Sequence, residues 1–237
     1  MDSDRNEFLY KKCYNKIMQI IPAINAKTFE EVKGKISKVK EFLPEGSWIH
    51  IDVADGKFSP NKIWGNPEEL KALIKSDSAL QKLNFEIHLM IINPELAIGG
   101  WVGAGAKRII AHEEALSDPE VIKDQCAIKD CEAMIAINPE TPVENLEKYF
   151  DDFKYFQILA VKPGWAGQKF DERVINKIKS LKDKNKNAKI EIDGGLNPET
   201  ARAAKDAGAD IFVSASYILS GDDLARNYQN LSEAVQK

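Results

Sequence analysis

The chain has 237 residues, of which 33 are Lys or Arg and 37 are Asp or Glu, so its formal net charge is −4 at pH 7. A chain of this length can bury a large core. Its acidic balance, without long runs of one sign, argues against proteins that bind nucleic acid or anionic membranes through a basic face. No segment approaches the ~18 consecutive apolar residues of a membrane span or has the pattern of a signal peptide. We therefore expect a soluble cytoplasmic protein.

The three cysteines are Cys13, Cys126 and Cys131. An odd count in a chain too large to need disulfides indicates reduced thiols and an intracellular location. Cys126 and Cys131 have neither a second cysteine pair nor a histidine nearby. They are predicted to be packing or surface residues rather than zinc ligands.

Short β-rich apolar runs alternate with amphipathic segments through most of the chain. Residues 1–15 precede this alternation and are predicted to be an N-terminal extension, followed by one catalytic domain over residues 16–237. The predicted strands are residues 17–24, 48–53, 85–91, 107–112, 133–138, 155–161, 188–193 and 210–216. The predicted helices are residues 28–43, 67–76, 94–102, 118–125, 142–149, 171–184, 198–208 and 222–236.

Several predicted helices carry recognisable start signals. Thr28 with Glu31 three residues later forms a capping-box pattern. An Asn or Asp directly before Pro is typical of an N-cap followed by the first helical residue. Such pairs are Asn66-Pro67, Asn93-Pro94, Asp118-Pro119 and Asn197-Pro198.

Eight strands that each precede a helix, with no linker-like tract between them, predict an α/β fold with a single (β/α)8 TIM barrel. The alternative is an open, doubly wound sheet. That fold usually has fewer strands and a glycine-rich phosphate motif after its first strand. Residues 22–26 follow the first strand here and contain no glycine, which favours the barrel.

Polar residues gather where the second, third and seventh predicted strands end. His50 and Asp52 share one face of their strand, His88 lies on the next strand, and Asp193 ends the seventh. Active sites of TIM barrels lie at these strand ends. Two imidazoles with two carboxylates suit a divalent ion such as Zn, Fe(II), Mn or Co. The alternative is that the histidines are hydrogen-bonded core residues, and the pattern alone leaves both interpretations open.

Small residues follow the sixth, seventh and eighth predicted strands, at 163–168, 194–195 and 215–216. Loops at these places are the recurring phosphate site of such barrels, because glycine lets backbone N–H groups approach an anion closely. Each loop by itself could be an ordinary tight turn. Three in consecutive positions favour a sugar-phosphate ligand.

With these motifs the chain resembles the ribulose-phosphate 3-epimerase family over residues 17–220. The matching stretches are His-Ile-Asp-Val-Ala-Asp-Gly at 50–56, Glu-Ile-His-Leu-Met at 86–90, Asn-Pro-Glu-Thr-Pro at 138–142, Pro-Gly-Trp-Ala-Gly-Gln-Lys-Phe at 163–170 and Asp-Gly-Gly at 193–195. The stretches at 86–90, on the third predicted strand, and at 163–170, after the sixth, are together specific for the family. Asp-Gly-Gly alone is weak evidence.

The resemblance implies a barrel of the ribulose-phosphate-binding type and an isomerase that interconverts D-ribulose 5-phosphate and D-xylulose 5-phosphate. It implies one divalent metal ion as cofactor and a homo-oligomer as a possible assembly. The implied metal ligands are His50, Asp52, His88 and Asp193, with Asp52 and Asp193 also acting as the catalytic acid/base pair. The implied substrate and phosphate contacts are His88, Met90, Gly164, Trp165, Ala166, Gly167, Gly194, Gly195, Ala215 and Ser216.

The implied residues suit the chemistry of an epimerisation. Epimerisation next to a ketone needs two proton carriers on opposite faces of a planar enediolate. A metal ion stabilises the negative charge that develops on the oxygens, so no nicotinamide or flavin is needed. Residues 163–170 are expected to close over the substrate as a lid. His112, the third histidine, is interpreted as structural or as a support for a metal ligand.

Departures from the family pattern leave the substrate open. Ala23 replaces a serine, Ala54 and Leu159 replace methionines, and Lys162 stands where an acidic or amide residue is usual. Small side chains at 23 and 54 favour, as an alternative, an epimerase of a larger ketose phosphate such as a hexulose 6-phosphate. A non-catalytic sugar-phosphate-binding barrel is a further alternative. A lyase of related barrels is disfavoured, because its Asp-x-Lys-x-x-Asp motif is absent from the sequence.

Overall fold

Hydrogen bonds from side chains fix the starts of four helices. In the computed structural model, which describes residues 18–236, Thr28 and Glu31 form the predicted capping box of helix α2. Asn66, Asp118 and Asn197 cap α3, α5 and α7 as predicted. Asn93 does not cap a helix: it adopts a left-handed conformation with φ 48°, which asparagine tolerates, and α4 begins two residues later. The predicted extension at residues 1–15 lies outside the described residues.

The helices lie between consecutive strands, as the alternation predicts. The α-helices are α2 (Phe29–Val39), α3 (Pro67–Ser76), α4 (Glu95–Ala104), α5 (Pro119–Ala127), α6 (Val174–Lys184), α7 (Pro198–Ala207) and α8 (Leu224–Gln236). Short 3-10 helices are η1 (Leu80–Lys82), η2 (Glu113–Ala115) and η3 (Val143–Tyr149). The segment at 142–149, predicted as an ordinary helix, is therefore a 3-10 helix.

The strands form one closed sheet. They are β1 (Gln19–Ile24), β2 (Trp48–Asp55), β3 (Lys62–Ile63), β4 (Asn84–Met90), β5 (Arg108–His112), β6 (Glu132–Ile137), β7 (Tyr155–Leu159), β8 (Lys189–Asp193) and β9 (Ile211–Ser214). All neighbours pair in parallel except β3, a short strand that the sequence did not predict and that pairs antiparallel with β2. β1 pairs with both β2 and β9, which closes the ring.

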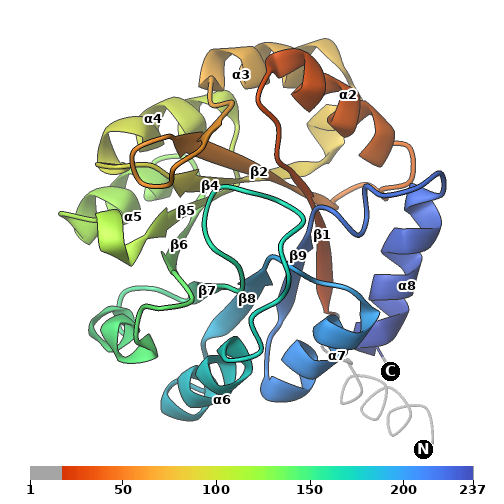
Figure 1. Ribbon diagram of the computed structural model, residues 1–237. Helices are drawn as coiled ribbons and strands as arrows, with labels where there is room; N and C mark the ends of the chain where they lie inside the picture. The colour runs from red at the N-terminus through yellow and green to blue at the C-terminus, as the bar shows by residue number, and fades with distance from the viewer. Residues whose placement is uncertain (1–17, 237) are drawn as a thin grey trace, which may run out of the picture.

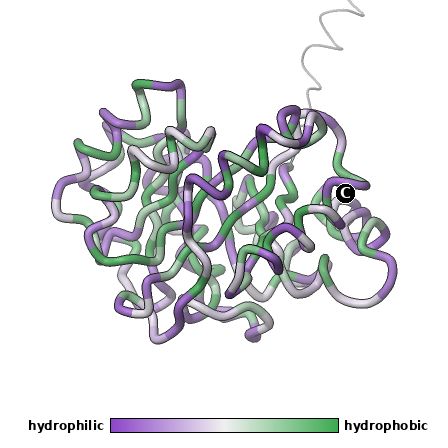
Figure 2. Tube along the Cα trace, turned by 90° about the horizontal axis from the view of Figure 1, so that it is seen from above, coloured by the Kyte–Doolittle hydropathy of each residue, from purple (hydrophilic) through white to green (hydrophobic). Residues whose placement is uncertain are grey.

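The closed ring with helices outside it is the predicted (β/α)8 barrel (Figure 1). Ile51, Ile87 and Phe156 exemplify strand residues that point outward and are fully buried against the helices. Figure 2 shows hydrophobic residues concentrated along the central strands and hydrophilic ones on the periphery. Within the part of the chain described, no helix is both long and apolar enough to cross a membrane.

The barrel interior is divided in character. Its apolar part comprises side chains of β1, β5, β6 and β9, namely Ile21, Ala23, Ile110, Met134, Ala136, Ile211 and Val213. Inward positions of β2, β4, β7 and β8 carry fully buried polar side chains, such as His50, Glu86, Gln157 and Glu191, and β5 adds Arg108 and His112. Since TIM barrels are usually filled with branched apolar residues, the polar part indicates a functional site.

Candidate metal and substrate site

Three strands position the four predicted metal ligands at one end of the barrel. His50 and Asp52 both lie on β2 and, being two residues apart, point to the same face. The parallel pairing of β2 with β4 sets Asp52 opposite His88, and Asp193 is the last residue of β8. Both histidines are fully buried and both aspartates are 8% exposed.

One atom from each ligand faces a common centre. Asp52 Oδ1 lies 3.2 Å from His50 Nε2 and 3.2 Å from His88 Nδ1. Asp193 Oδ2 lies 3.5 Å from His88 Nδ1 and 4.0 Å from His50 Nε2. Ligands bound at 2.0–2.2 Å around a tetrahedral ion stand roughly 3.3–3.6 Å from one another. The four residues therefore fit a divalent ion with little movement, and their mixed nitrogen and oxygen donors suit Zn, Fe(II), Mn or Co.

The remaining imidazole nitrogens have hydrogen-bond partners that suit metal binding. His50 Nδ1 lies 2.7 Å from Glu86 Oε1, so its N–H donates there and Nε2 presents a lone pair to the centre. His88 Nε2 lies 2.8 Å from His112 Nε2, and His112 Nδ1 lies 3.2 Å from Glu114 Oε2. With N–H donation running from His88 to His112 to Glu114, His88 Nδ1 is also free to bind. His112 thus contacts a ligand from behind, consistent with its predicted structural role.

Electrostatics at the centre favour a positive charge. Burial would lower the pKa of His50, but hydrogen bonds with Asp52 and Glu86 raise it well above its usual value. Burial would raise the pKa of Asp52, but hydrogen bonds with His50 and His88 hold it well below its usual range. Protons and metal ions compete for the same lone pairs. Without a metal ion the cluster binds protons tightly, because their positive charge offsets that of the buried carboxylates. A bound divalent ion would supply this positive charge instead.

Asn25, immediately after β1, is a site residue that the sequence did not reveal. Its Nδ2 donates to Asp52 Oδ2 at 2.9 Å, on the carboxylate oxygen that does not face the imidazoles. Lys35 on α2 in turn donates to the backbone carbonyl of Asn25. The sequence offered one signal, a polar residue directly after the first predicted strand. Its partner, Asp52, becomes evident only from the pairing of β1 with β2.

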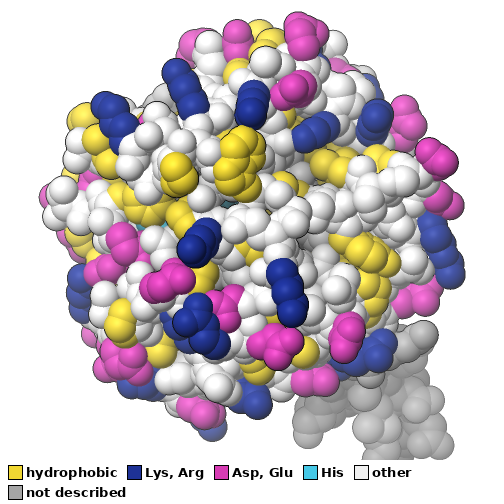
Figure 3. Space-filling view, viewed as in Figure 1, with side chains coloured by type: hydrophobic (Ala, Val, Ile, Leu, Met, Phe, Trp, Pro, Cys, Tyr) yellow, Lys and Arg dark blue, Asp and Glu magenta, His cyan; other side chains and the backbone are white. Residues whose placement is uncertain are grey.

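The predicted substrate residues surround one cavity above the ligands, except His88, which is fully buried and does not line it. Asp52, Met90, Leu159 and Asp193 form its floor, and Asn25 and Lys162 also line it. Its wall consists of Pro163, Gly164, Trp165, Ala166, Gly167, Gln168, Gly194, Gly195, Ala215 and Ser216. In Figure 1 the loop after β7 crosses over the barrel mouth. In Figure 3, which has the same view, the histidine side chains are almost completely hidden.

Two glycines in the wall are required by the backbone. Gly195 has φ +68°, and a Cβ there would lie 2.5 Å from the backbone N of Phe170. Gly164 has φ +109°, and a Cβ there would lie 2.8 Å from Ser59 Oγ. Both positions exclude larger residues, so backbone from the loops after β7 and β8 lies close together at the cavity wall. This is the arrangement that backbone phosphate binding needs.

The loop after β7 contacts the opposite side of the mouth through Trp165. Its ring, 47% exposed, lies 4.9 Å from Lys27 Nζ on the segment between β1 and α2. Gln168 holds the loop internally by donating to the carbonyls of Lys162 and Trp165. A cation–π contact of an exposed lysine is weak, on the order of 0.5–1 kcal/mol, so the contact is easily made and broken.

Comparison with known proteins agrees with the site. The model of the ribulose-phosphate 3 epimerase family matches residues 19–219. The chain belongs to this family. Ribulose-phosphate 3-epimerase of Chlamydia muridarum is 38% identical over 193 residues, which is 79% of this chain and 80% of that protein. The enzyme of the same name from Bacillus subtilis is 33% identical over 214 residues, or 87% of this chain and 94% of its own.

Membership of the epimerase family confirms the predicted resemblance and makes the protein an isomerase that acts on carbohydrates. Among solved structures, 3-keto-L-gulonate-6-phosphate decarboxylase from Vibrio cholerae has a TM-score of 0.69 at 14% identity, with 92% of this chain and 96% of that chain covered. At this identity the similarity shows the barrel fold alone.

The family departures divide into two groups by position. Leu159 and Lys162 line the cavity. Ala23 and Ala54 are 1% and 2% exposed and do not belong to the cavity wall. The expectation that small side chains at 23 and 54 enlarge the substrate pocket is therefore not supported by their position.

Proposed function

We propose that the protein interconverts D-ribulose 5-phosphate and D-xylulose 5-phosphate by proton transfer at C3, with a divalent ion bound by His50, Asp52, His88 and Asp193. One observation carries the proposal. Asp52 and Asp193, from β2 and β8, both reach the cavity floor, and each directs one carboxylate oxygen to the ligand cluster. The second oxygen of each is then proposed to transfer the proton, and that of Asp52 keeps a lone pair beside the hydrogen bond that it accepts from Asn25. When bound, the ion would stabilise negative charge on the substrate oxygens.

The proposed reaction conserves all atoms of the sugar. One aspartate takes the proton from C3, and the electron pair of the C–H bond moves toward C2 to form an enediolate. The other aspartate returns a proton to C3 from the opposite face, which inverts this centre. Asn25 orients Asp52, and the loops after β7, β8 and β9 hold the phosphate by backbone N–H groups.

Solvent exchange tests the two-aspartate mechanism. In D2O, deuterium should enter C3 only, as detected by NMR of ribulose 5-phosphate. Asp52→Asn and Asp193→Asn should each lower the exchange rate by ~10²–10⁴-fold, the usual contribution of a positioned acid or base. Asp151→Asn, on the exposed surface, is the matched control. Normal exchange in both site variants would overturn the mechanism.

A panel of substrates tests the sugar. We expect the highest kcat/KM with the pentulose 5-phosphates, measured with Zn, Mn, Fe(II) and Co in turn. Higher kcat/KM with a hexulose 6-phosphate would replace the proposed substrate, and binding of sugar phosphates without exchange at any carbon would replace the proposed activity.

A further inference from the structure

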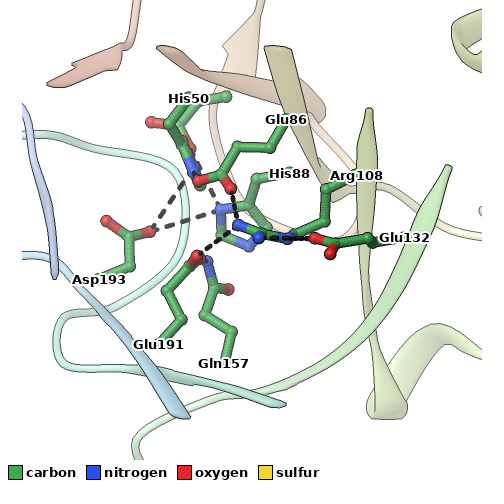
Figure 4. Close-up of polar contacts among 9 residues, drawn as sticks. His50, Glu86, His88, Arg108, Glu132, Gln157, Glu191 and Asp193 are labelled. Carbon is green, nitrogen blue, oxygen red and sulfur yellow. Dashed lines mark hydrogen bonds and ion pairs between the residues drawn. The ribbon is translucent and has the colours of Figure 1, made fainter. Parts of the chain in front are cut away.

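A charged layer lies directly beneath the ligand cluster inside the barrel (Figure 4). Its centre is Arg108 on β5, which is 2% exposed. Arg108 Nη1 donates to Glu86 Oε2, while Nε and Nη2 lie 2.8 Å and 2.6 Å from Glu132 Oε2. Nη1 also lies 3.6 Å from Glu191 Oε2, and Gln157 donates to the other oxygen of Glu191 at 2.9 Å. A guanidinium with its fixed fork of donors is suited to such a bridging position.

These contacts follow from strand register. His50 stands opposite Glu86 on the β2–β4 pair, Glu86 opposite Arg108 on β4–β5, and Arg108 opposite Glu132 on β5–β6. The four side chains thus form one row across four adjacent strands. Each neighbouring pair in this row is joined by a hydrogen bond, so the barrel itself aligns a chain of hydrogen bonds that ends on a ligand.

Two aromatic rings pack against the guanidinium. The Arg108 Cζ atom lies 4.1 Å from the centre of the Trp48 ring and 4.8 Å from that of Tyr155. Tyr155 donates through its hydroxyl to Glu132 at 2.6 Å. Arg108 does not line the substrate cavity. Its hydrogen-bonded route to the ligand cluster runs through Glu86 to His50, and Glu191 lies beside the same two residues.

We propose that Arg108 is a positioning residue of the metal site: by holding one oxygen of Glu86, it fixes the other on His50 Nδ1 and so aims His50 Nε2 at the ion. The inference rests on the proposed metal site and deepens it. Partners that orient a metal-binding histidine typically change metal affinity by about 10–100-fold when removed. Without Arg108 the buried carboxylate of Glu86 loses its second partner, and the orientation of His50 is no longer imposed.

The test compares Arg108→Met, Arg108→Lys and Glu132→Gln with the wild type. Zn and Mn affinities are measured by competition with a chelator, and the hydrogen bond from His50 Nδ1–H to Glu86 is read from ¹H and ¹⁵N NMR of the metal-free protein. We expect Arg108→Met to weaken binding by about 10–100-fold and to lose the Nδ1–H signature. Arg108→Lys should recover part of both, because it restores a cation next to Glu86.

The KM for the sugar phosphate distinguishes a positioning role of Arg108 from a general structural defect of its variants. Because Arg108 lies outside the cavity, KM for the sugar phosphate at saturating metal should stay within about threefold while metal affinity falls. Arg173→Met, an exposed arginine paired with Asp171, is the control and should change neither quantity. Wild-type metal affinity and an intact Nδ1–H in a folded Arg108→Met protein would overturn the proposal.

Glu132→Gln keeps the test decisive if Arg108→Met does not fold. This variant removes the anchor of Arg108 on β6 without touching Glu86 or His50, and a smaller loss of metal affinity in the same direction is expected. No loss in either Glu132→Gln or Arg108→Lys would overturn the proposal. If the wild type binds no ion, the proposed metal-dependent function fails, whereas the ring proton of His50 still tests the positioning role.

Discussion

The carboxylate of Asp52 makes a different contact with each of its oxygens. Oδ1 faces the two imidazoles at 3.2 Å each, and Oδ2 accepts from Asn25 at 2.9 Å. The two sets of contacts fix the plane of the carboxylate. Precise placement of a catalytic group contributes strongly to rate, because small displacements lower it considerably.

Asn25→Leu should therefore slow catalysis. A hydrogen bond to a charged group contributes ~1.5–3 kcal/mol, and each ~1.4 kcal/mol corresponds to a factor of ten, so we expect kcat to fall by roughly tenfold or more. Steady-state kinetics at saturating metal measure this. Asn187→Leu, at an exposed position, is the control. An unchanged kcat for Asn25→Leu would show that Asp52 needs no second partner.

Glu191 should make stability depend on pH. Burial and the charge of Glu86 raise the pKa of Glu191 to about 8 in the folded protein. The folded state then binds this proton more tightly than the unfolded state does, so its contribution is complete below the unfolded pKa of ~4.3 and is lost as pH rises through 8. Glu191→Gln stays neutral and should lose less stability between pH 5 and 8.

Urea unfolding of the metal-free protein at several pH values measures this difference. Glu172→Gln, at an exposed position, should follow the wild-type pH dependence. Parallel curves for Glu191→Gln and the wild type would mean that Glu191 is ionised throughout this range.

At the scale of elements, the loops after β7 and β8 depend on each other at Gly195. Gly195→Ala would force a Cβ against the backbone of Phe170 and a left-handed conformation that costs about 1–2 kcal/mol by itself. We expect the free energy of unfolding to fall by at least ~2 kcal/mol and KM for the phosphorylated substrate to rise. Gly34→Ala is the matched control.

The control should change stability in the opposite direction. Gly34 lies within α2, and a Cβ there would meet no atom within 4 Å. Alanine in a helix interior is more favourable than glycine by roughly 0.5–1 kcal/mol, so Gly34→Ala should be slightly more stable than the wild type with unchanged kinetics. Equal behaviour of the two variants would contradict a special role of Gly195.

Periodicity predicted the elements well because it reflects burial of one face, which is local in sequence. It failed where tertiary contacts decide: residues 143–149 wind as a 3-10 helix, and β3 forms only because the chain folds back onto β2. In the site, the residues at strand ends were foreseeable from the barrel. The bonds of Asn25 and Arg108 were not, because they depend on which strands become neighbours and in which register.

At the scale of the whole molecule, bound metal should stabilise the folded state. An ion present at 100 times its Kd adds about 2.7 kcal/mol, and for a chain of this size ~1 kcal/mol shifts Tm by about 2–4 °C. Removal by a chelator should therefore lower Tm by roughly 5–11 °C in calorimetry, and readdition should restore it.

Asp193→Asn provides the control for metal removal. This variant lacks one ligand of the proposed ion, so its Tm should respond much less to the chelator than that of the wild type. An identical Tm of the wild type with chelator and with Zn, Mn, Fe(II) or Co would contradict a resident ion.

The pairing of β1 with β9 has a consequence for biosynthesis. Ile21 pairs with Val213, so the ring of strands is completed by segments from nearly opposite ends of the described chain. A ribosome makes β1 first and β9 last, and until β9 emerges both β1 and β8 present strand edges open to other chains. A nascent chain that stops short of β9 should therefore be prone to aggregate rather than form a smaller barrel.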